Sequence, residues 1–287
     1  MILLTGASGK TGKAILSALK QRGTLTRVLV RSAEQASELV NLGAAEAVIG
    51  DLRDQSSLIT AIKGCDRLYY ICPNVTPDEV QIGKTLLEIA KKENLKHFVY
   101  HSVLHPQIEA MPHHWQKMRM EEAIFESRLD FTILQPCAYM QNILANWKSI
   151  TETGVYPVPY AASARISIVD LMDVAAAAAL VLSRQGHENS IYELAGPQPL
   201  SQDEVAAAFS KILGRSVTAR VVDRSNWAEN ARKTGNSEYQ VNTLLMMFEY
   251  YEKHGLIGNP NTLSRLLNQP AATFEAFIKR HLASSSN

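Results

Sequence analysis

The glycine-rich stretch near the start of the chain constrains the fold more than any other feature. A short apolar run, Ile2–Leu4, leads into glycines at positions 6, 9 and 12, and a helical pattern follows them. Glycine lets the backbone turn sharply, and its missing Cβ lets a ligand approach the main chain. Unpaired N–H groups at a helix N-terminus carry partial positive charge and attract anions. The stretch therefore predicts a pyrophosphate site between a buried strand and a helix.

Two kinds of nucleotide site compete for this stretch. Gly9-Lys10-Thr11 is similar to the end of an ATPase-type phosphate loop, but that loop needs a glycine five residues before Gly9, where the chain has Leu4. The spacing Gly6-x-x-Gly9-x-x-Gly12 instead fits a Rossmann turn, and it differs by one position from the standard G-x-G-x-x-G. An ordinary strand-to-helix turn is the plain alternative. We favour the Rossmann turn because it directly follows a strand and opens a helix.

A cationic residue ends the second predicted strand, 26–31. In a Rossmann βαβ unit the residue at this place meets the adenosine ribose, where an acid selects NAD and an arginine accommodates the 2′-phosphate of NADP. Here Arg31 holds the place, and the first acid after it is Glu34. A guanidinium makes charge-assisted, bidentate contacts with phosphate. We therefore expect NADP(H) to be preferred over NAD(H), the alternative being a solvated surface arginine.

Strands and helices alternate through the first half of the chain. Further apolar strands are expected at 47–50, 68–72, 98–103 and 131–136, with helices at 33–42, 57–62 and 80–93 between them. This alternation predicts an α/β fold, a Rossmann-type doubly wound parallel sheet. Beyond it the rhythm becomes irregular, which indicates a smaller C-terminal α+β substrate region. Within that region we expect a helix to about Ile150, and another to Ser183 capped by Asp170 or Asp173.

The domain boundaries follow from this change of rhythm. We place the NADP-binding Rossmann domain at 1–142, with about 164–195 returning to it. The smaller substrate or partner domain takes 143–163 and 196–287. No internal repeat or low-complexity linker separates the two. The second domain is therefore expected to be woven from separate segments.

Composition and charge narrow the classes of partner. The 287 residues are 46% hydrophobic and 20% charged, as in a soluble globular protein, and the net charge of +1 gives no electrostatic case for a nucleic-acid or membrane partner. The three cysteines have neither metal spacing nor the density of a disulfide scaffold, so we expect no metal and a cytoplasmic location. Met1 leads straight into a strand, so no signal peptide is expected. The longest apolar run, 174–182, is too short to span a bilayer.

The chain resembles the NmrA-like family, atypical short-chain dehydrogenases of the extended type. Besides the glycine turn and Arg31, the residues that carry the resemblance are Asp51-Leu52, His101-Ser102, the segment from His113 to Lys117 that runs into Glu121-Glu122, and Thr132 to Pro136 leading to Tyr139-Met140-Gln141-Asn142. The resemblance covers the whole chain. It implies NADP(H) binding and one of two functions. Some members reduce quinones or dyes, and others sense the dinucleotide and control a partner protein with little or no catalysis.

The resemblance also implies where each part of the cofactor lies. The glycine turn would hold the pyrophosphate, the arginine the 2′-phosphate, and Asp51-Leu52 the adenine. Asp51 has a plain alternative as a helix cap, a task that Asp54 or Ser56 could also perform. The segment 72–74 would line the nicotinamide-side ribose, Lys117 would contact the ribose or the nicotinamide, and 139–142 would close over the nicotinamide. The implied cofactor-binding residues are Gly6, Ala7, Ser8, Gly9, Lys10, Thr11, Gly12, Arg31, Asp51, Leu52, Cys72, Pro73, Asn74, Lys117, Tyr139 and Asn142.

The catalytic pair of typical short-chain dehydrogenases is altered. These enzymes carry Tyr-x-x-x-Lys on a helix, and here Lys117 is kept while the tyrosine position is His113. Histidine can act as a general acid near neutral pH, and a spacing of four puts both side chains on one helical face. A loop or surface histidine is the plain alternative. Ser102 would orient a substrate or simply cap its strand, and Tyr139 would supply a phenol or stack on the cofactor. The candidate catalytic residues are Lys117, His113, Tyr139 and Ser102.

We favour a reductase over a sensor, because the sensors of the family that this chain resembles are best known as eukaryotic regulators and this compact chain shows no extra interaction tail. Quinone or dye reduction needs little from the protein, because water can protonate the electron-rich oxygen once hydride has been transferred. The missing tyrosine argues against alcohol–ketone interconversion and sugar epimerisation, and it suits a sensor. We therefore expect an NADPH-dependent oxidoreductase that transfers hydride to a small quinone-like or aromatic acceptor. The alternative is an NADP(H)-sensing regulatory protein with a protein partner, and the sequence sets no oligomeric state.

Overall fold

The computed structural model describes residues 1–285 and divides into two compact units, each made of three segments. The first unit comprises 1–107, 114–135 and 174–192, and the second comprises 108–113, 136–173 and 193–287. This division differs from the expected one, because 108–113, 136–142, 164–173 and 193–195 belong to the second unit. A strand pairing within that unit, described below, accounts for 136–142 and 164–173.

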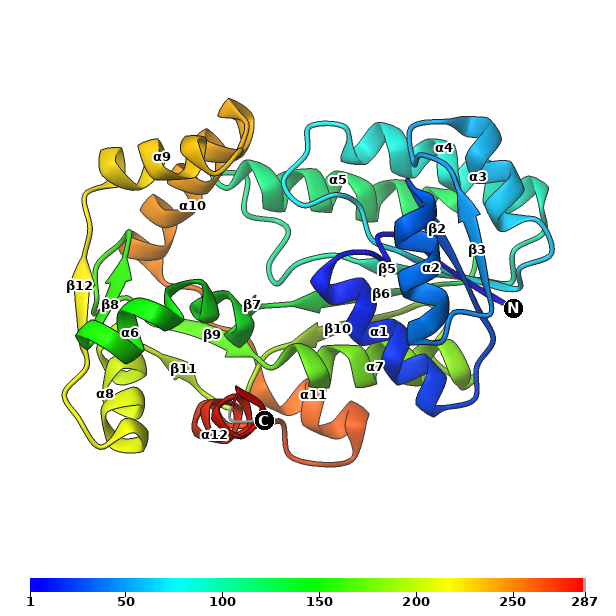
Figure 1. Cartoon of the computed structure of the whole chain (residues 1–287). Helices are drawn as coiled ribbons and strands as arrows, with labels where there is room; N and C mark the ends of the chain where they lie inside the picture. The colour runs from blue at the N-terminus through cyan, green and yellow to red at the C-terminus, as the bar shows by residue number, and fades with distance from the viewer. Residues whose placement is uncertain (286–287) are drawn as a thin grey trace. The chain divides into compact units, whose positions relative to one another are not determined.

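A seven-stranded sheet forms the centre of the first unit (Figure 1). Its order is β10-β6-β5-β4-β1-β2-β3, and β1 to β6 pair in parallel. The order reverses between β4 and β1, where ligands bind in doubly wound folds. The predicted Rossmann-type fold class is confirmed. The strands are β1 Ile2–Leu4, β2 Thr26–Val30, β3 Glu46–Ile49, β4 Arg67–Tyr70, β5 His97–His101, β6 Phe131–Pro136 and β10 Ser190–Leu194.

The helices that connect these strands begin and end at local signals. The side chain of Asp54 accepts hydrogen bonds from the backbone N–H groups of Ser56 and Ser57 and so caps α3, and Gly43 ends α2 in the left-handed conformation. In Figure 1, α3, α4 and α5 lie above the sheet, and α1 and α7 lie below it. The helices are α1 Lys10–Gln21, α2 Ala33–Leu42, α3 Gln55–Ile62, α4 Glu79–Lys92, α5 Pro112–Ser127 and α7 Leu171–Ser183.

Aromatic side chains fill the core between the sheet and its helices. Tyr69, Tyr70, Phe98 and Tyr100 are fully buried. The rings of Tyr70 and Tyr100 stack with centroids 5.6 Å apart. Neighbouring strands β4 and β5 are therefore covered on both faces, as the continuous apolar run of β4 predicts. Burial on both faces fixes the carboxyl ends of these strands, which carry the candidate site.

The second unit contains two small sheets. In the first of them β7 pairs with β9 in parallel, Ala138 opposite Ile168 and Tyr139 opposite Val169, and β11 adds on antiparallel. This pairing draws 136–142 and 164–173 into the second unit. In the other sheet β8 and β12 pair in parallel. The strands are β7 Ala138–Tyr139, β8 Val155–Val158, β9 Ile166–Val169, β11 Pro199–Leu200 and β12 Thr218–Val221.

The helices of the second unit follow its sequence signals closely. The single helix expected to end near Ile150 is a 3₁₀ segment followed by an α-helix that ends at Thr153. Ser201 and Glu204 form a reciprocal capping box at the start of α8. The Phe209 ring makes edge contacts with the rings of both Trp147 and Phe274 and forms a local core with them. The elements are η1 Met140–Asn146, α6 Trp147–Thr153, α8 Gln202–Leu213, α9 Arg224–Lys233, α10 Glu238–His254, α11 Pro260–Leu267 and α12 Phe274–Ser285.

Candidate functional site

The glycine turn between β1 and α1 is closed so tightly that side chains do not fit. Gly6 has φ +60°, and a Cβ there would lie 2.9 Å from Cβ of Ile71. A Cβ at Gly12 would press on the carbonyl oxygen of Gly6 and lie 2.5 Å from Cα of Ala7. Real Cβ atoms do not approach backbone this closely, so Gly6 and Gly12 are required by the fold of the turn.

The turn presents an open helix N-terminus. Gly9 is the N-cap of α1 and has no side chain with which to cap the first N–H groups. Its own N–H donates to the carbonyl oxygen of Gly6 over 3.1 Å, which holds the turn in shape. Ala7 is fully buried below the turn, whereas Ser8, Lys10 and Thr11 retain solvent exposure around it. An uncapped N-terminus beside glycines fits the pyrophosphate of a dinucleotide.

Arg31 directly follows β2 and extends into solvent. Within residues 1–285 its guanidinium makes no hydrogen bond and no ion pair, and only its backbone N–H is engaged, by Gln35 Oε1 at 3.0 Å. The next residue, Ser32, accepts a hydrogen bond from the Gln35 N–H and caps α2. Arg31 is therefore an available cation beside a helix N-terminus, which is a suitable setting for a phosphate.

Asp51 and Leu52 follow β3. The carboxylate of Asp51 accepts a hydrogen bond from the backbone N–H of Arg53 at 2.8 Å, and Leu52 packs against the hydrophobic core. Because Asp54 caps α3, Asp51 is not needed as a helix cap. The guanidinium of Arg53 binds the carboxylate of Asp78, Nη2 to Oδ2, at 2.9 Å. The adenine role of Asp51 and Leu52 stays a prediction.

Cys72, Pro73 and Asn74 follow β4. Cys72 is buried, and burial together with the nearby Glu79 carboxylate raises the pKa of its thiol to about 12. The thiol therefore remains protonated at neutral pH and is no nucleophile. Pro73 and Asn74 are exposed. The role expected for residues 72–74 is therefore to line the ribose site and not to take part in a reaction.

Lys117 lies in a buried polar network. Its Nζ donates to Oε1 of Glu79 at 2.6 Å and to the carbonyl oxygen of His101 at 2.9 Å. The Tyr100 hydroxyl donates to the same Glu79 oxygen at 2.7 Å. The side chains of Lys117 and Glu79 are 6% and 0% exposed. The ammonium thus lies at the carboxyl end of β5, where ligands bind in an open α/β sheet.

Sequence reasoning missed Glu79. The predicted helix began at Val80, so Glu79 was left outside it, whereas α4 begins at Glu79. Glu79 is buried together with Ile82, Gly83 and Leu86 on one helical face. The sequence did contain a signal for this residue, because Glu79 falls on the apolar face of the helical pattern that follows it. An acid on such a face is buried and needs a polar partner inside the protein.

Ser102 is engaged within the first unit. Its hydroxyl donates to Oε1 of the buried Glu121, which also accepts from the side-chain amide of Gln135 at 2.9 Å. Burial raises the pKa of the Glu121 carboxyl, and these two hydrogen bonds oppose the rise. The hydroxyl of Ser102 therefore binds a side-chain carboxylate and does not cap the backbone at the end of its strand, which was the plain alternative. Its substrate-orienting role stays a prediction.

Three other predicted site residues lie in α5, β7 and η1. His113 is buried, and it precedes Lys117 by four positions in α5. Tyr139 lies in β7 and Asn142 in η1, so both belong to the second unit. Their roles at the nicotinamide, and that of His113 in proton transfer, stay predictions.

A buried carboxylate anchors the segment after β7. Asp170 accepts hydrogen bonds from the Gln141 side chain at 2.8 Å and from the Met172 backbone N–H at 3.0 Å, and it pairs with Arg280 of α12. Of the two acids expected to cap α7, Asp170 is thus the cap. Asp173 instead accepts a hydrogen bond from the Ala272 N–H at 2.7 Å.

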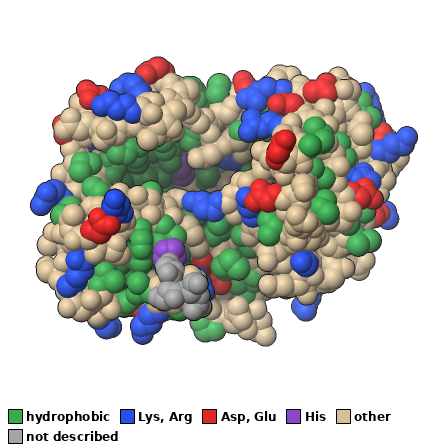
Figure 2. All heavy atoms as spheres, in the orientation of Figure 1, with side chains coloured by type: hydrophobic (Ala, Val, Ile, Leu, Met, Phe, Trp, Pro, Cys, Tyr) green, Lys and Arg blue, Asp and Glu red, His purple; other side chains and the backbone are tan. Residues whose placement is uncertain are grey.

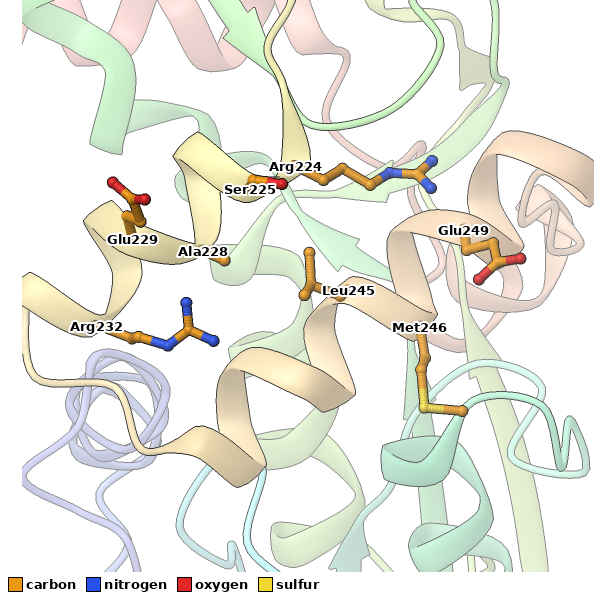
Figure 3. Close-up of a pocket in the computed structure, with 8 residues that line it drawn as sticks. All are labelled: Arg224, Ser225, Ala228, Glu229, Arg232, Leu245, Met246 and Glu249. Atoms are coloured by element: carbon orange, nitrogen blue, oxygen red, sulfur yellow. The ribbon is translucent and has the colours of Figure 1, made fainter.

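A cavity of about 410 Å³ opens between α9 and α10. Arg224 and Arg232 extend from α9, and Leu245 and Glu249 from α10 (Figure 3). Arg224 pairs with Glu252 at 2.8 Å and Arg232 with Glu238 at 2.6 Å, so both cations already have counter-ions. The cavity includes no residue that the sequence predicts for the site. It is lined by Arg224, Ser225, Ala228, Glu229, Arg232, Leu245, Met246 and Glu249.

Among residues 1–285 no group of three His, Cys, Asp or Glu side chains is arranged to hold a metal ion. In the same residues no helix combines the length and apolarity needed to cross a bilayer.

The chain is similar in sequence to one protein family and to several characterised proteins. The model of the NmrA-like family matches residues 1–278. NAD(P)H azoreductase from Xenophilus azovorans is 32% identical over 285 residues, which cover 99% of this chain and 98% of that protein. Quinone oxidoreductase 2 from Escherichia coli (strain K12) is 27% identical over 289 residues and is matched over 100% of both chains.

Solved structures agree with this placement. The crystal structure of an NADPH-dependent quinone oxidoreductase from Escherichia coli complexed with NADPH matches with a TM-score of 0.86 at 27% identity, covering 98% of this chain and 99% of that chain. Triphenylmethane reductase from Citrobacter sp. has the same fold, with a TM-score of 0.86 at 24% identity. A family model that spans nearly the whole chain and a full-length relative at 32% identity establish that the chain belongs to the NmrA-like family.

Proposed function

We propose that the chain is an NADPH-dependent reductase that transfers hydride to a quinone-like or other aromatic acceptor. The observation that carries the proposal is the glycine turn between β1 and α1, because it fits a dinucleotide pyrophosphate. It is supported by full-length relatives that are named NAD(P)H azoreductase and quinone oxidoreductase 2, and by a similar quinone oxidoreductase structure that holds NADPH. When bound, the nicotinamide supplies a hydride. A quinone that accepts this hydride also takes one proton and becomes a hydroquinone. Water or a side chain can supply that proton.

Different residues of the chain bind different parts of the dinucleotide. The turn at 6–12 holds the pyrophosphate, and Arg31 holds the 2′-phosphate. Lys117 donates to the ribose or to the nicotinamide carboxamide at the carboxyl end of β5. An ammonium has three donors, and Lys117 uses two of them, on Glu79 and His101. The third is available to a ligand.

The second unit offers aromatic surface suited to a planar acceptor. Figure 2 shows hydrophobic side chains gathered in a hollow below α9 and α10. Trp227, Phe248 and Tyr160 of the second unit are partly exposed, and Phe248 contacts both of the other rings, with centroids 4.7 Å from Trp227 and 5.7 Å from Tyr160. Aromatic pairs prefer offset or edge-to-face contacts, so exposed ring faces can stack on a planar ligand. These rings support an aromatic acceptor over an aliphatic one.

The proposed reaction is tested by mixing the protein with NADPH and a panel of acceptors in a stopped-flow spectrometer. Benzoquinones, naphthoquinones and a triphenylmethane dye should oxidise NADPH rapidly, while aliphatic aldehydes should not. Loss of NADPH absorbance gives the rates, and the same panel without protein gives the background. Tight NADPH binding with no turnover on any acceptor would instead support the regulatory, NADP(H)-sensing alternative.

Cofactor selectivity tests the role of Arg31. The wild type should bind NADPH more tightly than NADH, and Arg31→Ala should lower the NADPH affinity about tenfold to a hundredfold, the worth of hydrogen bonds to a charged group. NADH affinity should stay within about twofold, because NADH lacks the 2′-phosphate. Fluorescence titration measures both constants. Arg220→Ala, which removes another exposed arginine, is the control. Equal NADPH and NADH affinities in the wild type would contradict the role.

A further inference from the structure

The carboxylate of Glu79 is unusual among the acids of the first unit because it is completely buried. Oε1 accepts from both Lys117 and Tyr100, and across the described chain Oε2 has no hydrogen-bond partner. Burying a charge is costly unless the charge is paired and hydrogen-bonded. A carboxylate with one unsatisfied oxygen at this depth therefore depends on its ion pair with Lys117.

The ion pair is also specific. Glu121 is the other buried acid near Lys117, but its hydrogen-bond partners are Ser102 and Gln135, so Glu79 is the contacting counter-ion. The Lys117 ammonium also lies 5.1 Å from the centre of the Tyr100 ring, a cation–π distance. The remaining titratable groups that face the pair are Tyr70, Cys72, His101 and His114.

We propose that Glu79 is the positioning residue for Lys117. Its carboxylate holds the ammonium in place, with Nζ against the His101 carbonyl and one N–H directed to the dinucleotide. Glu79 touches neither cofactor nor acceptor and acts only through Lys117. The inference rests on the proposed role of Lys117 in cofactor binding. It adds a helix α4 residue to a site otherwise built from strand ends, the N-terminus of α1 and α5.

A double-variant cycle tests this assignment through NADPH affinity, measured by fluorescence without any acceptor. Glu79→Gln keeps the shape of the side chain and removes its charge. We expect Glu79→Gln and Lys117→Met each to weaken NADPH binding about tenfold or more, because each removes the same charge-assisted contact. The double variant should bind as weakly as either single variant and no more weakly, since coupled residues are not additive.

Thermal unfolding of the protein without cofactor gives a second readout. Each single variant leaves an unpaired buried charge, so its melting temperature should fall by about 10 °C. The double variant removes both charges and should recover most of this loss. Glu79→Asp keeps the charge and should retain more NADPH affinity than Glu79→Gln. Tyr156→Phe, which deletes a buried hydrogen bond to Gln202 in the second unit, is the matched control and should lower the melting temperature without changing NADPH affinity.

Four results would overturn the proposal. The first is a Glu79→Gln variant that unfolds at a lower temperature but binds NADPH like the wild type, and the second is a double variant in which the two single losses of NADPH affinity multiply. The third is a Lys117→Met variant with unchanged NADPH affinity, and the fourth is a wild type that binds no dinucleotide. If Glu79→Gln does not fold, the double variant is compared with Lys117→Met: equal affinities sustain the proposal and a further loss overturns it. Failure to reduce any acceptor, with the coupling intact, overturns only the proposed reaction.

Discussion

Replacing Gly12 by alanine should abolish measurable NADPH binding and lower the free energy of unfolding by about 3 kcal/mol, the upper range for overpacking. Gly12 lies in α1 without a positive φ, so helix propensity alone would favour alanine by about 1 kcal/mol. The added Cβ, however, would press on the Gly6 carbonyl oxygen and the Ala7 backbone. Neither can rotate away, so the turn must open. Urea unfolding and NADPH titration measure the two effects.

Gly9→Ala separates strain in the turn from access by the ligand. A Cβ at Gly9 would lie 3.4 Å from the Gly6 carbonyl oxygen, an ordinary contact, so this variant should fold with nearly wild-type stability. It should nevertheless bind NADPH more weakly, because the second glycine of the turn lets the backbone approach the pyrophosphate. A Gly12→Ala protein that binds NADPH as the wild type does would show that the cradle is not the dinucleotide site.

Stability should fall steeply below about pH 6.5, where unfolded histidine takes up a proton. Burial lowers the pKa of His97 and His114 to about 4 and that of His101 to about 3. Between these values and about pH 6.5 the unfolded chain binds more protons than the folded one, so stability decreases as the pH falls. One pKa unit corresponds to about 1.4 kcal/mol, so the three histidines together approach about 10 kcal/mol near pH 3, comparable with the whole stability of a domain.

His97 gives the sharpest test of this pH dependence. The Thr132 hydroxyl donates to the His187 carbonyl and must therefore accept from Nε2 of His97, at 2.8 Å. This fixes the proton on Nε2 and leaves Nδ1 buried without a partner in the described residues. Protonation of Nδ1 would then create an unpaired buried charge.

His97→Gln should accordingly lose less stability than the wild type between about pH 7 and pH 4.5. Urea unfolding at several pH values measures the difference, and His254→Gln at an exposed position is the control. Glu121 and Asp173, whose carboxyl pKa values are raised by burial, act in the opposite direction and reduce the total. An identical pH profile for wild type and His97→Gln would contradict the assignment.

Local signals predicted much of this structure. The strand and turn at the start of the chain depend on contacts within a few residues, and so does the cap of α3, for which the sequence offered Asp54 as one candidate. Strand positions were found, but their ends were displaced: β4 ends at Tyr70, whereas the apolar run continues to Cys72. An apolar run indicates which residues are buried, and residues can remain buried beyond the last hydrogen bond that pairs their strand with its neighbour.

Contacts between distant residues could not be predicted in the same way. Glu79 and Lys117 are 38 positions apart, and no spacing rule joins an acid on one helix to a lysine on another. Similarly, Ala138 and Tyr139 read as a continuation after β6, yet they pair with β9 in a different sheet. A strand of two residues is too short for its sequence pattern to indicate which strand it pairs with. The boundary expected after residue 142 therefore lies several residues later than the one observed after residue 135.

The path of the chain has a practical consequence for engineering. Because each unit is made of three separate segments, the chain passes from one unit to the other after residues 107, 113, 135, 173 and 192. No single cut releases either unit whole, and removing the residues after 135 would take β10 away and leave β6 as an unprotected sheet edge. Chimaeras that exchange one unit between relatives must therefore graft three stretches together, and a simple fusion at one junction would yield an aggregation-prone product.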